Sequence, residues 1–296
     1  MVVKALGEHY FEDSKFPLHI CRVNQDALIT HEHDLTEIEY THNFIELVFI
    51  VKGTGVQVIE SQEYDVSTGD VFVLQGNQKY FFKNTSKLEI INVIFCSKST
   101  RGFVSNHIKQ LKGFRALFLL ESRYRATHYL KNKLHLNRKK LLSLEHLLNA
   151  MISEQINKRD GYRIILTNKI QELIVLLSRY YSSLGAIEAE SLLQLSKVLE
   201  HLENNYHEKI YLNNLAKIAC MSTRNFQRVF RKAVGVSPMQ YIMQIRLKEA
   251  KKLLLDSSQS IADIAVATGF NDVNYFIKCF KLYQKTTPLR YRSGHP

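Results

Sequence analysis

The sequence predicts an α+β protein of two domains. The first is a small antiparallel β-barrel followed by helices, and the second is an all-α domain of two tandem helix-turn-helix units. Apolar and polar residues alternate between glycine turns from residue 18 to about 96, a pattern typical of short strands. From Asn137 the apolar period becomes helical, and the last third of the chain repeats at an offset of 50 residues.

Length and composition support this division and exclude several classes of protein. At 296 residues the chain exceeds one ordinary domain of about 100–200 residues. Its 45% hydrophobic and 23% charged residues are typical of a folded soluble protein. No apolar stretch approaches the roughly 20 residues of a membrane helix, and the acidic N-terminus is unlike a signal peptide. We therefore expect a cytoplasmic protein with no membrane partner. The four cysteines form no Cys-x-x-Cys pair, so we expect reduced thiols.

The first domain, residues 1–136, is predicted to be the barrel. Segments 56–59 and 70–74 have the apolar pattern of strands. Residues 114–136 are expected to add further strands. Glycine-containing turns are expected at 52–55, 67–70 and 75–77.

Residues 137–190 are predicted to be a helical region between the two domains. One apolar stripe, three and four residues apart, consists of Leu141, Leu144, Leu148 and Ile152. A second apolar helix covers about 164–181, and 182–190 is the expected linker. Such stripes belong either to a plain core or to a dimer interface, and their spacing does not decide between the two.

The second domain, residues 191–296, contains the repeat. The pairs are Phe226 with Phe276, Phe230 with Phe280, Ser237 with Thr287, Pro238 with Pro288, and Tyr241 with Tyr291. Each unit is predicted to be a helix, a turn, a second helix, and a helix opened by a Ser or Thr cap and a Pro. The leading helices are expected at 211–219, before the cap Ser222, and at 261–268, before Gly269. The turn region is expected to be four residues longer in the second unit.

Helical spacing gives the second helix of each unit an inner and an outer face. The inner faces are Phe226, Val229, Phe230 and Ala233 in the first unit, and Phe276, Cys279, Phe280 and Tyr283 in the second. The outer faces are Arg224, Gln227, Arg228 and Arg231 in the first unit, and Asn274, Ile277, Lys278 and Lys281 in the second. Arg and Gln read base edges or hold phosphates, and Val273 and Ile277 suit a thymine methyl. A single basic face indicates only solvated surface, whereas two in a tandem repeat indicate nucleic acid.

Charge and length fit this interpretation. From residue 191 onward 16 Lys and Arg stand against 7 Asp and Glu, a net charge of +9, whereas residues 1–190 have 24 against 21, a net charge of +3. This balance is typical of a phosphate-binding module joined to a sensing or assembly module, although a merely basic surface has the same balance. The helix predicted at 238–255 is about 27 Å long, which suits two contacts one DNA turn of ~34 Å apart.

The C-terminal motifs resemble the signature of AraC/XylS-family transcriptional regulators over about 100 residues. They are Ser260-Ile261-Ala262-Asp263-Ile264-Ala265, Gly269-Phe270 and Phe276-x3-Phe280-x6-Thr287-Pro288-x2-Tyr291. The positions that this resemblance places on bases or phosphates are Arg224, Gln227, Arg228, Val273, Asn274 and Lys278. It also implies activation by contact with RNA polymerase, with Asp263 where relatives touch the sigma subunit. An acidic residue in a first helical turn also suits the helix dipole.

The N-terminal half resembles the cupin sensor domain of the same family's sugar regulators. Its pattern Leu88-x-Ile90-x-Asn92-x-Ile94 is most similar to the L-rhamnose-responsive branch. Metal-binding cupins carry His-x-His-x3-Glu-x6-Gly and a later His. Here His42, Glu46 and Gly53 keep their places, but Tyr40 replaces the first His, and Tyr80 or Lys79 the late one. A second match, His31-x-His33-x3-Glu37, has Phe44 in place of the Gly, so we expect no metal and no other cofactor.

A barrel that has lost its metal ligands can hold a small neutral ligand, because apolar walls supply area and a few polar groups supply orientation. We expect the effector to be a monosaccharide or a small glycoside. The expected lining is His42, Glu46, Tyr80, Phe82 and Asn92. A buried His–Glu hydrogen bond or a core aromatic would account for the same residues structurally.

These observations predict a ligand-responsive, sequence-specific transcription factor. It is expected to be an activator, to act as a homodimer at promoter half-sites in double-stranded DNA, and not to be an enzyme. Three alternatives stay open: a cupin enzyme with a nucleic-acid-binding tether, a repressor that responds to a non-sugar ligand, and a nucleoid-type binder without sequence preference. The enzyme would need more metal ligands than the motif retains, and a nonspecific binder would have no use for a ligand barrel.

Overall fold

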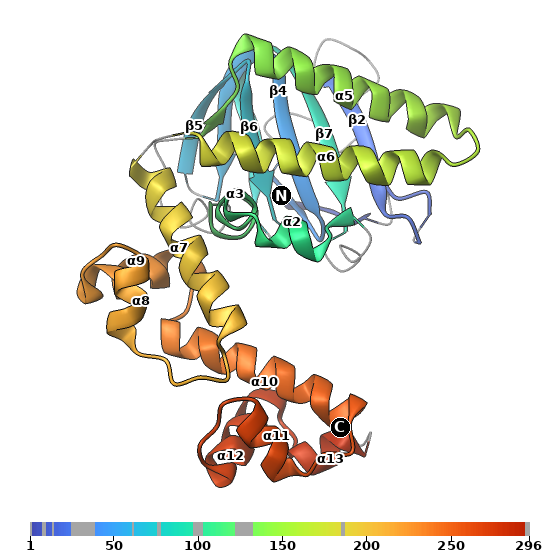
Figure 1. The fold of residues 1–296 in the computed structure, drawn as a ribbon. Coiled ribbons are helices and arrows are strands. Elements are labelled where there is room, and N and C mark those ends of the chain that lie inside the picture. The colour runs from blue at the N-terminus through green and yellow to red at the C-terminus, as the bar shows by residue number, and fades with distance from the viewer. Residues whose placement is uncertain are drawn as a thin grey trace. The chain divides into compact units, whose positions relative to one another are not determined.

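The computed structural model divides into two compact units, Met1–Leu193 and Gln194–Pro296. The first contains a β-sheet with helices, and the second contains helices only (Figure 1). The structure describes residues 2–7, 10–13, 15–24, 39–60, 62–75, 78–96, 103–121, 133–184 and 187–293.

The first unit is built on an eight-stranded sheet that is antiparallel except for the pair β1 and β3. The strands are β1 (Val2–Ala5), β2 (Leu18–Asn24), β3 (Glu39–His42), β4 (Ile45–Ile59), β5 (Gln62–Ser67), β6 (Asp70–Leu74), β7 (Tyr80–Phe95) and β8 (Leu134–His135). β7 pairs with β2, β3 and β4, and β4 pairs also with β5 and β6. The predicted antiparallel β domain is confirmed, and its described strands pair along an open, branched path.

The central strands β4 and β7 are longer than the short strands that the sequence predicts. A turn was expected at residues 52–55, but β4 runs through them with register shifts between Ile50 and Val56. Gly53 has a φ of 83°, and a Cβ there would lie 2.2 Å from the carbonyl oxygen of Lys87. This glycine therefore permits a bulge and a close approach of two strands, and no chain reversal occurs. The turn at 67–70 is confirmed, whereas residues 76–77 of the third expected turn lie outside the described residues.

The bends of β4 and β7 bring both halves of these strands to one apolar core. Val48 and Ile50 from the first half of β4 and Ile59 from its end belong to one cluster. The other buried members are Val23, Tyr64, Val66, Phe72, Leu74, Phe82, Leu88 and Ile90. We call the side of the sheet that carries this cluster the inner face.

Helical turns replace part of the predicted strand region 114–136. The π-helix η2 (Arg115–Glu121) lies within this region, directly after α2 (Asn106–Gln110) and α3 (Lys112–Phe114). Of the expected strands, the described residues contain β8, and 122–132 lie outside them. The prediction was wrong because a short, almost unbroken apolar run fits a buried helix as well as a buried strand. A Cβ at Gly113 would lie 1.9 Å from the carbonyl oxygen of Ser178, so α3 approaches the helix that contains Ser178 very closely.

Two long helices, α5 (Arg138–Asn157) and α6 (Tyr162–Ser182), pass side by side across one face of the sheet (Figure 1). Asn137 caps α5 by accepting a hydrogen bond from the Lys140 amide. The predicted stripe of leucines is buried, but Met151 continues it and Ile152 is only half-buried. α6 buries Leu166, Ile170, Leu173, Ile174, Leu177, Ser178 and Tyr181. These stripes therefore contribute to the core of the unit.

The remaining helices are α7 (Ile187–Asn204), α8 (Leu212–Ile218), α9 (Thr223–Val234), α10 (Pro238–Asp256), α11 (Ile261–Ala267), α12 (Val273–Gln284) and α13 (Pro288–Arg292). The linker predicted at 182–190 is shorter than expected, because α6 ends at Ser182 and α7 begins at Ile187. No helix in the described parts of the chain is long and apolar enough to cross a membrane.

The repeat is present in the structure with its aromatic contacts. Ser237 and Thr287 cap α10 and α13, each followed by a buried Pro, as predicted. The Phe226 and Phe230 ring centroids lie 5.5 Å apart, and those of Phe276 and Phe280 lie 5.7 Å apart. The edge contacts at the next helix also match: Phe230 with Tyr241 at 5.8 Å, and Phe280 with Tyr291 at 5.5 Å.

Candidate nucleic-acid interface and ligand site

Helix α9 presents a polar face to solvent. It begins after Ser222, whose hydroxyl accepts a hydrogen bond from the Asn225 amide, and ends at Gly235, which has a φ of 86°. Its outer residues are all exposed, as predicted: Arg224, Gln227, Arg228 and Arg231. Asn225 Oδ1 accepts a hydrogen bond of 2.8 Å from Arg228 Nη2, which orients this guanidinium along the helix. Four adjacent donor-bearing side chains on one exposed face can hold phosphates or reach base edges.

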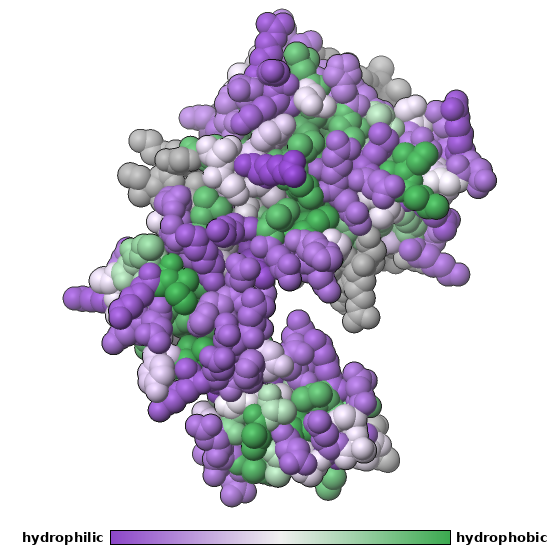
Figure 2. All heavy atoms as spheres, in the orientation of Figure 1, coloured by the Kyte–Doolittle hydropathy of each residue, from purple (hydrophilic) through white to green (hydrophobic). Residues whose placement is uncertain are grey.

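Helix α12 has the same position in the second unit but a different outer chemistry. Asp272 caps it by accepting from the Tyr275 amide, and the cations Lys278 and Lys281 are exposed beside Asn274. Hydrophilic side chains, interrupted by apolar patches, cover much of the visible face of the helical unit (Figure 2).

Two residues of α12 were predicted on the wrong face of the helix. Tyr283, expected inside, is 40% exposed, because the last turn of α12 extends beyond the core. Ile277, expected outside, is half-buried and packs with Val273 against the core of the unit. Ile277 lies at the border between the faces, and burial of its apolar side chain is favourable. Both apolar side chains are thus less available to a thymine methyl than expected.

The turns before α9 and α12 share one backbone geometry. The amides of Met221 and Phe270 donate to the carbonyls of Ala216 and Ala265, each at 2.9 Å. Between them, Cys220 and Gly269 both have a positive φ, 53° and 84°. Five residues separate α11 from α12 and four separate α8 from α9, so the second turn is one residue longer and not four.

Asp263, the candidate polymerase contact, lies exposed in the first turn of α11. Its amide donates to Ser260 Oγ at 3.1 Å, and Ser260 Oγ donates to Asp263 Oδ2 at 2.7 Å. The carboxylate therefore also stabilises the start of the helix.

Three of the predicted ligand residues are neighbours at one end of the sheet. The Tyr80 hydroxyl donates to Glu46 Oε2 at 2.7 Å, and His42 Nε2 lies 3.5 Å from the same oxygen. His42 and Glu46 are 1% and 2% exposed. Burial lowers the pKa of His42 to about 4, because the charged imidazolium would lose its hydration. The imidazole is therefore neutral at pH 7.

Asn92 and Phe82 lie further along β7. Phe82 belongs to the apolar cluster, and Asn92 is buried opposite Val48 and Cys21 in the strand register. Gln57, which the sequence reasoning missed, lies in register with Phe82 and Tyr64 and is 0% exposed. Gln57 lies two residues before Ile59, and residues two apart in a strand point to the same face of the sheet, so the Gln57 amide points toward the apolar cluster that contains Ile59.

Buried amide atoms on this sheet lack partners. Neither amide atom of Gln57, nor Oδ1 of Asn92, has a hydrogen-bond partner among the described residues. Each such group costs about 1–3 kcal/mol when it is left unsatisfied. A ligand that both donates and accepts hydrogen bonds would remove this cost.

The donor set does not fit the metal site of a cupin. His42 and Glu46 come together, but the third position is the buried Tyr40, and Lys79 is paired with Glu39. In the described part of the chain, no group of three His, Cys, Asp or Glu side chains could hold a metal ion. The second motif, His31 to Glu37, lies outside the described residues.

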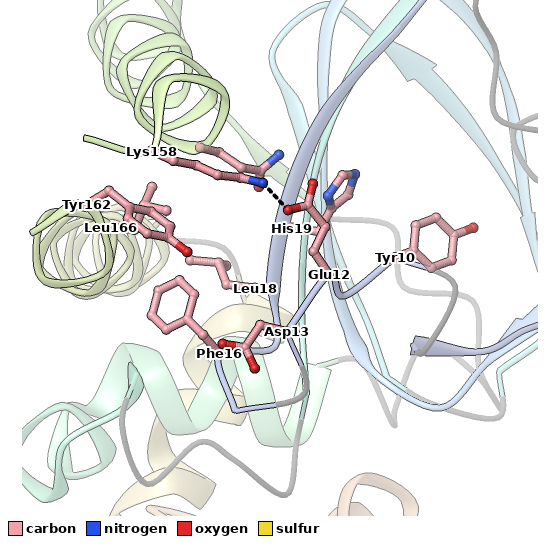
Figure 3. Close-up of a pocket in the computed structure, with 10 residues that line it drawn as sticks. Tyr10, Glu12, Asp13, Phe16, Leu18, His19, Lys158, Tyr162 and Leu166 are labelled. Atoms are coloured by element: carbon pink, nitrogen blue, oxygen red, sulfur yellow. Dashed lines mark hydrogen bonds and ion pairs between the residues drawn. The ribbon is translucent and has the colours of Figure 1, made fainter. Parts of the chain in front are cut away.

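A separate hollow lies between the N-terminal segment and the helices α5 and α6 (Figure 3). Lys158 on its wall pairs with Glu12. Gln155 donates to the Ile20 carbonyl at 3.0 Å and accepts from the Ile20 amide at 2.8 Å. Because these polar groups are already bonded within the chain, the hollow offers less to a ligand than Gln57 and Asn92 do.

Comparison with known proteins gives two domain matches. A helix-turn-helix domain family matches residues 215–294, and a cupin domain family matches residues 30–94. Among the similar curated proteins are "HTH-type transcriptional activator RhaS" of Enterobacter sp. (strain 638), 27% identical over 86% of this chain and 87% of that protein, and its namesake of Citrobacter koseri, 27% identical over 96% and 95%. A solved C-terminal domain of the response regulator yesN from Fusobacterium nucleatum is 34% identical over 32% of this chain and 93% of that domain, with a TM-score of 0.31.

Proposed function

The chain belongs to the AraC/XylS family of transcriptional regulators, and we propose that it activates transcription from promoter half-sites with two boxes when a small neutral ligand binds inside its cupin-like domain. It is a DNA-binding regulator whose curated relatives are activators. The observation that carries the two-box proposal is the matched pair of exposed second helices, α9 and α12, on one duplicated core. We call these two the recognition helices.

The helical domain binds double-stranded DNA. The proposed contacts are Arg224, Gln227, Arg228 and Arg231 on α9, and Val273, Asn274, Lys278 and Lys281 on α12. All of these charged and amide side chains are exposed, which supports the assignments. The hydrogen bond from Arg228 to Asn225 also orients the guanidinium of Arg228. Val273 is half-buried, so its contribution to DNA binding is the smallest of the set.

The proposed effector is a monosaccharide or small glycoside bound by His42, Glu46, Tyr80, Phe82 and Asn92, to which we add Gln57. The Glu46 carboxylate disfavours an anionic ligand, and the neutral His42 offers no charge to offset it. The amides of Gln57 and Asn92 donate and accept, as do sugar hydroxyls. An aromatic and aliphatic wall beside a few oriented polar groups is typical of small-molecule sites.

We further propose that the protein is a cytoplasmic homodimer, is not an enzyme, and touches the sigma subunit of RNA polymerase through Asp263. Exposed apolar residues support self-association near the α5–α6 connection. They are Ile156, Ile164 and Ile165, which are 71%, 69% and 40% exposed. The two-ligand remnant of the metal motif disfavours the alternative of a cupin enzyme.

Selection of bound sequences from a random DNA library by the full-length protein, with and without a sugar mixture, tests the regulator. We expect half-sites with two short boxes about 10 base pairs apart, and an occupancy that changes with sugar. Recovery of no motif would contradict the proposal and favour the nonspecific binder.

Calorimetry with the full-length protein and a panel of pentoses, hexoses and deoxyhexoses tests the effector. We expect one sugar to bind, and Gln57→Leu to weaken it at least tenfold. No heat with any sugar would refute the sugar assignment, while DNA selection would still stand.

A further inference from the structure

One side chain on the long connecting helix touches both the segment that leads into the first helix-turn-helix unit and the turn of the second. Arg246 lies half-buried on α10. Its Nε donates to the carbonyl of Tyr206 and its Nη2 to the carbonyl of Glu208, each at 2.7 Å. These two carbonyls belong to the segment 205–211, which connects α7 to α8, the leading helix of the first helix-turn-helix unit. Its Cζ lies 5.9 Å from the ring centroid of Phe270, in the second unit.

The contacts of Arg246 lead to both recognition helices. Phe270 packs its ring against Phe276 at 5.0 Å and Tyr275 at 6.3 Å, both in the first turns of α12. On the other side, Asn213 of α8 accepts a 3.0 Å hydrogen bond from Thr223 of α9. Each of the two bonded carbonyls lies within seven residues of Asn213. The guanidinium is thus a bridge between the supports of α9 and of α12.

A second contact closes the same junction. The turn of the second helix-turn-helix unit approaches the segment before α8 so closely that a Cβ on Gly269 would lie 2.8 Å from the carbonyl oxygen of His207. Burial lowers the pKa of the Arg246 guanidinium, which marks its removal from water. A planar fork that bonds two loop carbonyls at once holds this junction in one geometry.

We propose that Arg246 is a positioning residue that fixes α12 relative to α9 and thereby sets which spacing between two DNA boxes the chain accepts. This inference rests on the two-box function proposed above. One inserted base pair moves a box by ~3.4 Å and rotates it about the duplex axis. A rigid pair of helices cannot follow that change, whereas a loosened pair can.

The test compares three duplexes: the selected two-box site, and the same site with one base pair added or removed between the boxes. We expect the full-length protein to lose at least tenfold in affinity on either altered duplex. For Arg246→Ala, affinity for the selected site should fall, and the penalty for altered spacing should shrink below threefold. Preference within each box should be unchanged, because no base-reading side chain is altered.

Lys248→Ala is the matched control, because Lys248 is an exposed cation two residues away on the same helix. It should keep the full spacing penalty. Arg246→Lys should be intermediate, since an ammonium cannot bond both carbonyls in the fork geometry. If Arg246→Ala melts below the assay temperature, Arg246→Lys carries the same comparison.

An equal loss on all three duplexes would mean that Arg246 only stabilises the fold, and would overturn the proposal. So would an unchanged spacing penalty. Selection of single boxes by the unaltered protein would refute the two-box function itself, and that outcome is visible before any variant is made.

Discussion

The two helix-turn-helix units share their interior and differ at their surface. Each buries two phenylalanines with nearly equal ring separations, 5.5 Å and 5.7 Å. Outside, α9 presents three arginines and a glutamine, whereas α12 presents two lysines and an asparagine. Packing constrains an inner residue through all its neighbours, whereas an outer residue is constrained only by what it binds. The two units therefore have matching interiors, while their outer faces carry different chemistry.

The outer difference has a chemical meaning. Guanidinium and amide groups form paired hydrogen bonds with base edges, whereas an ammonium acts as a point charge that suits phosphate. We therefore expect α9 to supply most of the preference for particular DNA sequences, and α12 to contribute mainly affinity for the phosphate backbone of DNA.

The largest expected effect tests the shared interior. Phe230→Ala and Phe280→Ala should each lower the free energy of unfolding of the helical unit by about 3–5 kcal/mol, because each leaves a cavity in a closed core. Urea unfolding of the full-length protein measures both. A difference of more than about 2 kcal/mol between them would contradict the equivalence of the two interiors.

The equivalent turn positions should respond unequally. Gly269→Ala should lower the free energy of unfolding by about 2–3 kcal/mol, because it adds backbone strain and a contact with His207. Cys220→Ala should stay within about 0.5 kcal/mol, since Cys220 is exposed and already carries a Cβ at positive φ. Thermal melts of both variants provide the measurement, and equal losses would mean that the contact with His207 is unimportant.

On the divergent surface, Gln227→Ala should cost about 1–3 kcal/mol of binding at a matched site and relax the preference at one base pair. Binding to a set of sites mutated one base pair at a time measures this. An equal loss of affinity for all DNA sequences would show instead that Gln227 contacts only the phosphate backbone of DNA.

The smallest effect on specificity is expected at Lys278. Lys278→Ala should weaken binding to all sequences by a similar factor and reduce the slope of log affinity against log salt by about 1. Titrations at several salt concentrations measure the slope. Loss of preference at a single base pair would refute the division of roles between α9 and α12.

The sequence predicted best where a residue type has one structural use. Ser222, Ser237 and Thr287 cap helices as expected, because a hydroxyl before a helical period satisfies free amides there. Gly53 led to the wrong prediction of a turn at 52–55, because glycine occurs both in turns and in β-bulges. In the candidate site, His42, Glu46 and Tyr80 were found through the resemblance to the cupin motif, and the structure places them together. Gln57 was missed although it shares the phase of Ile59, because the register shifts between Ile50 and Val56 reverse the phase that Val48 and Ile50 set in the first half of β4.

Cys220, the residue with a positive φ in the turn before α9, has a practical use. Cys220 is exposed, whereas Cys21 and Cys96 are partly covered and Cys279 is buried. A thiol-reactive fluorophore should therefore attach preferentially at this turn, four residues from Arg224, without any engineered cysteine. The unaltered chain thus carries its own labelling position beside α9, the helix that we propose contacts DNA, and binding and release can be followed from it in real time.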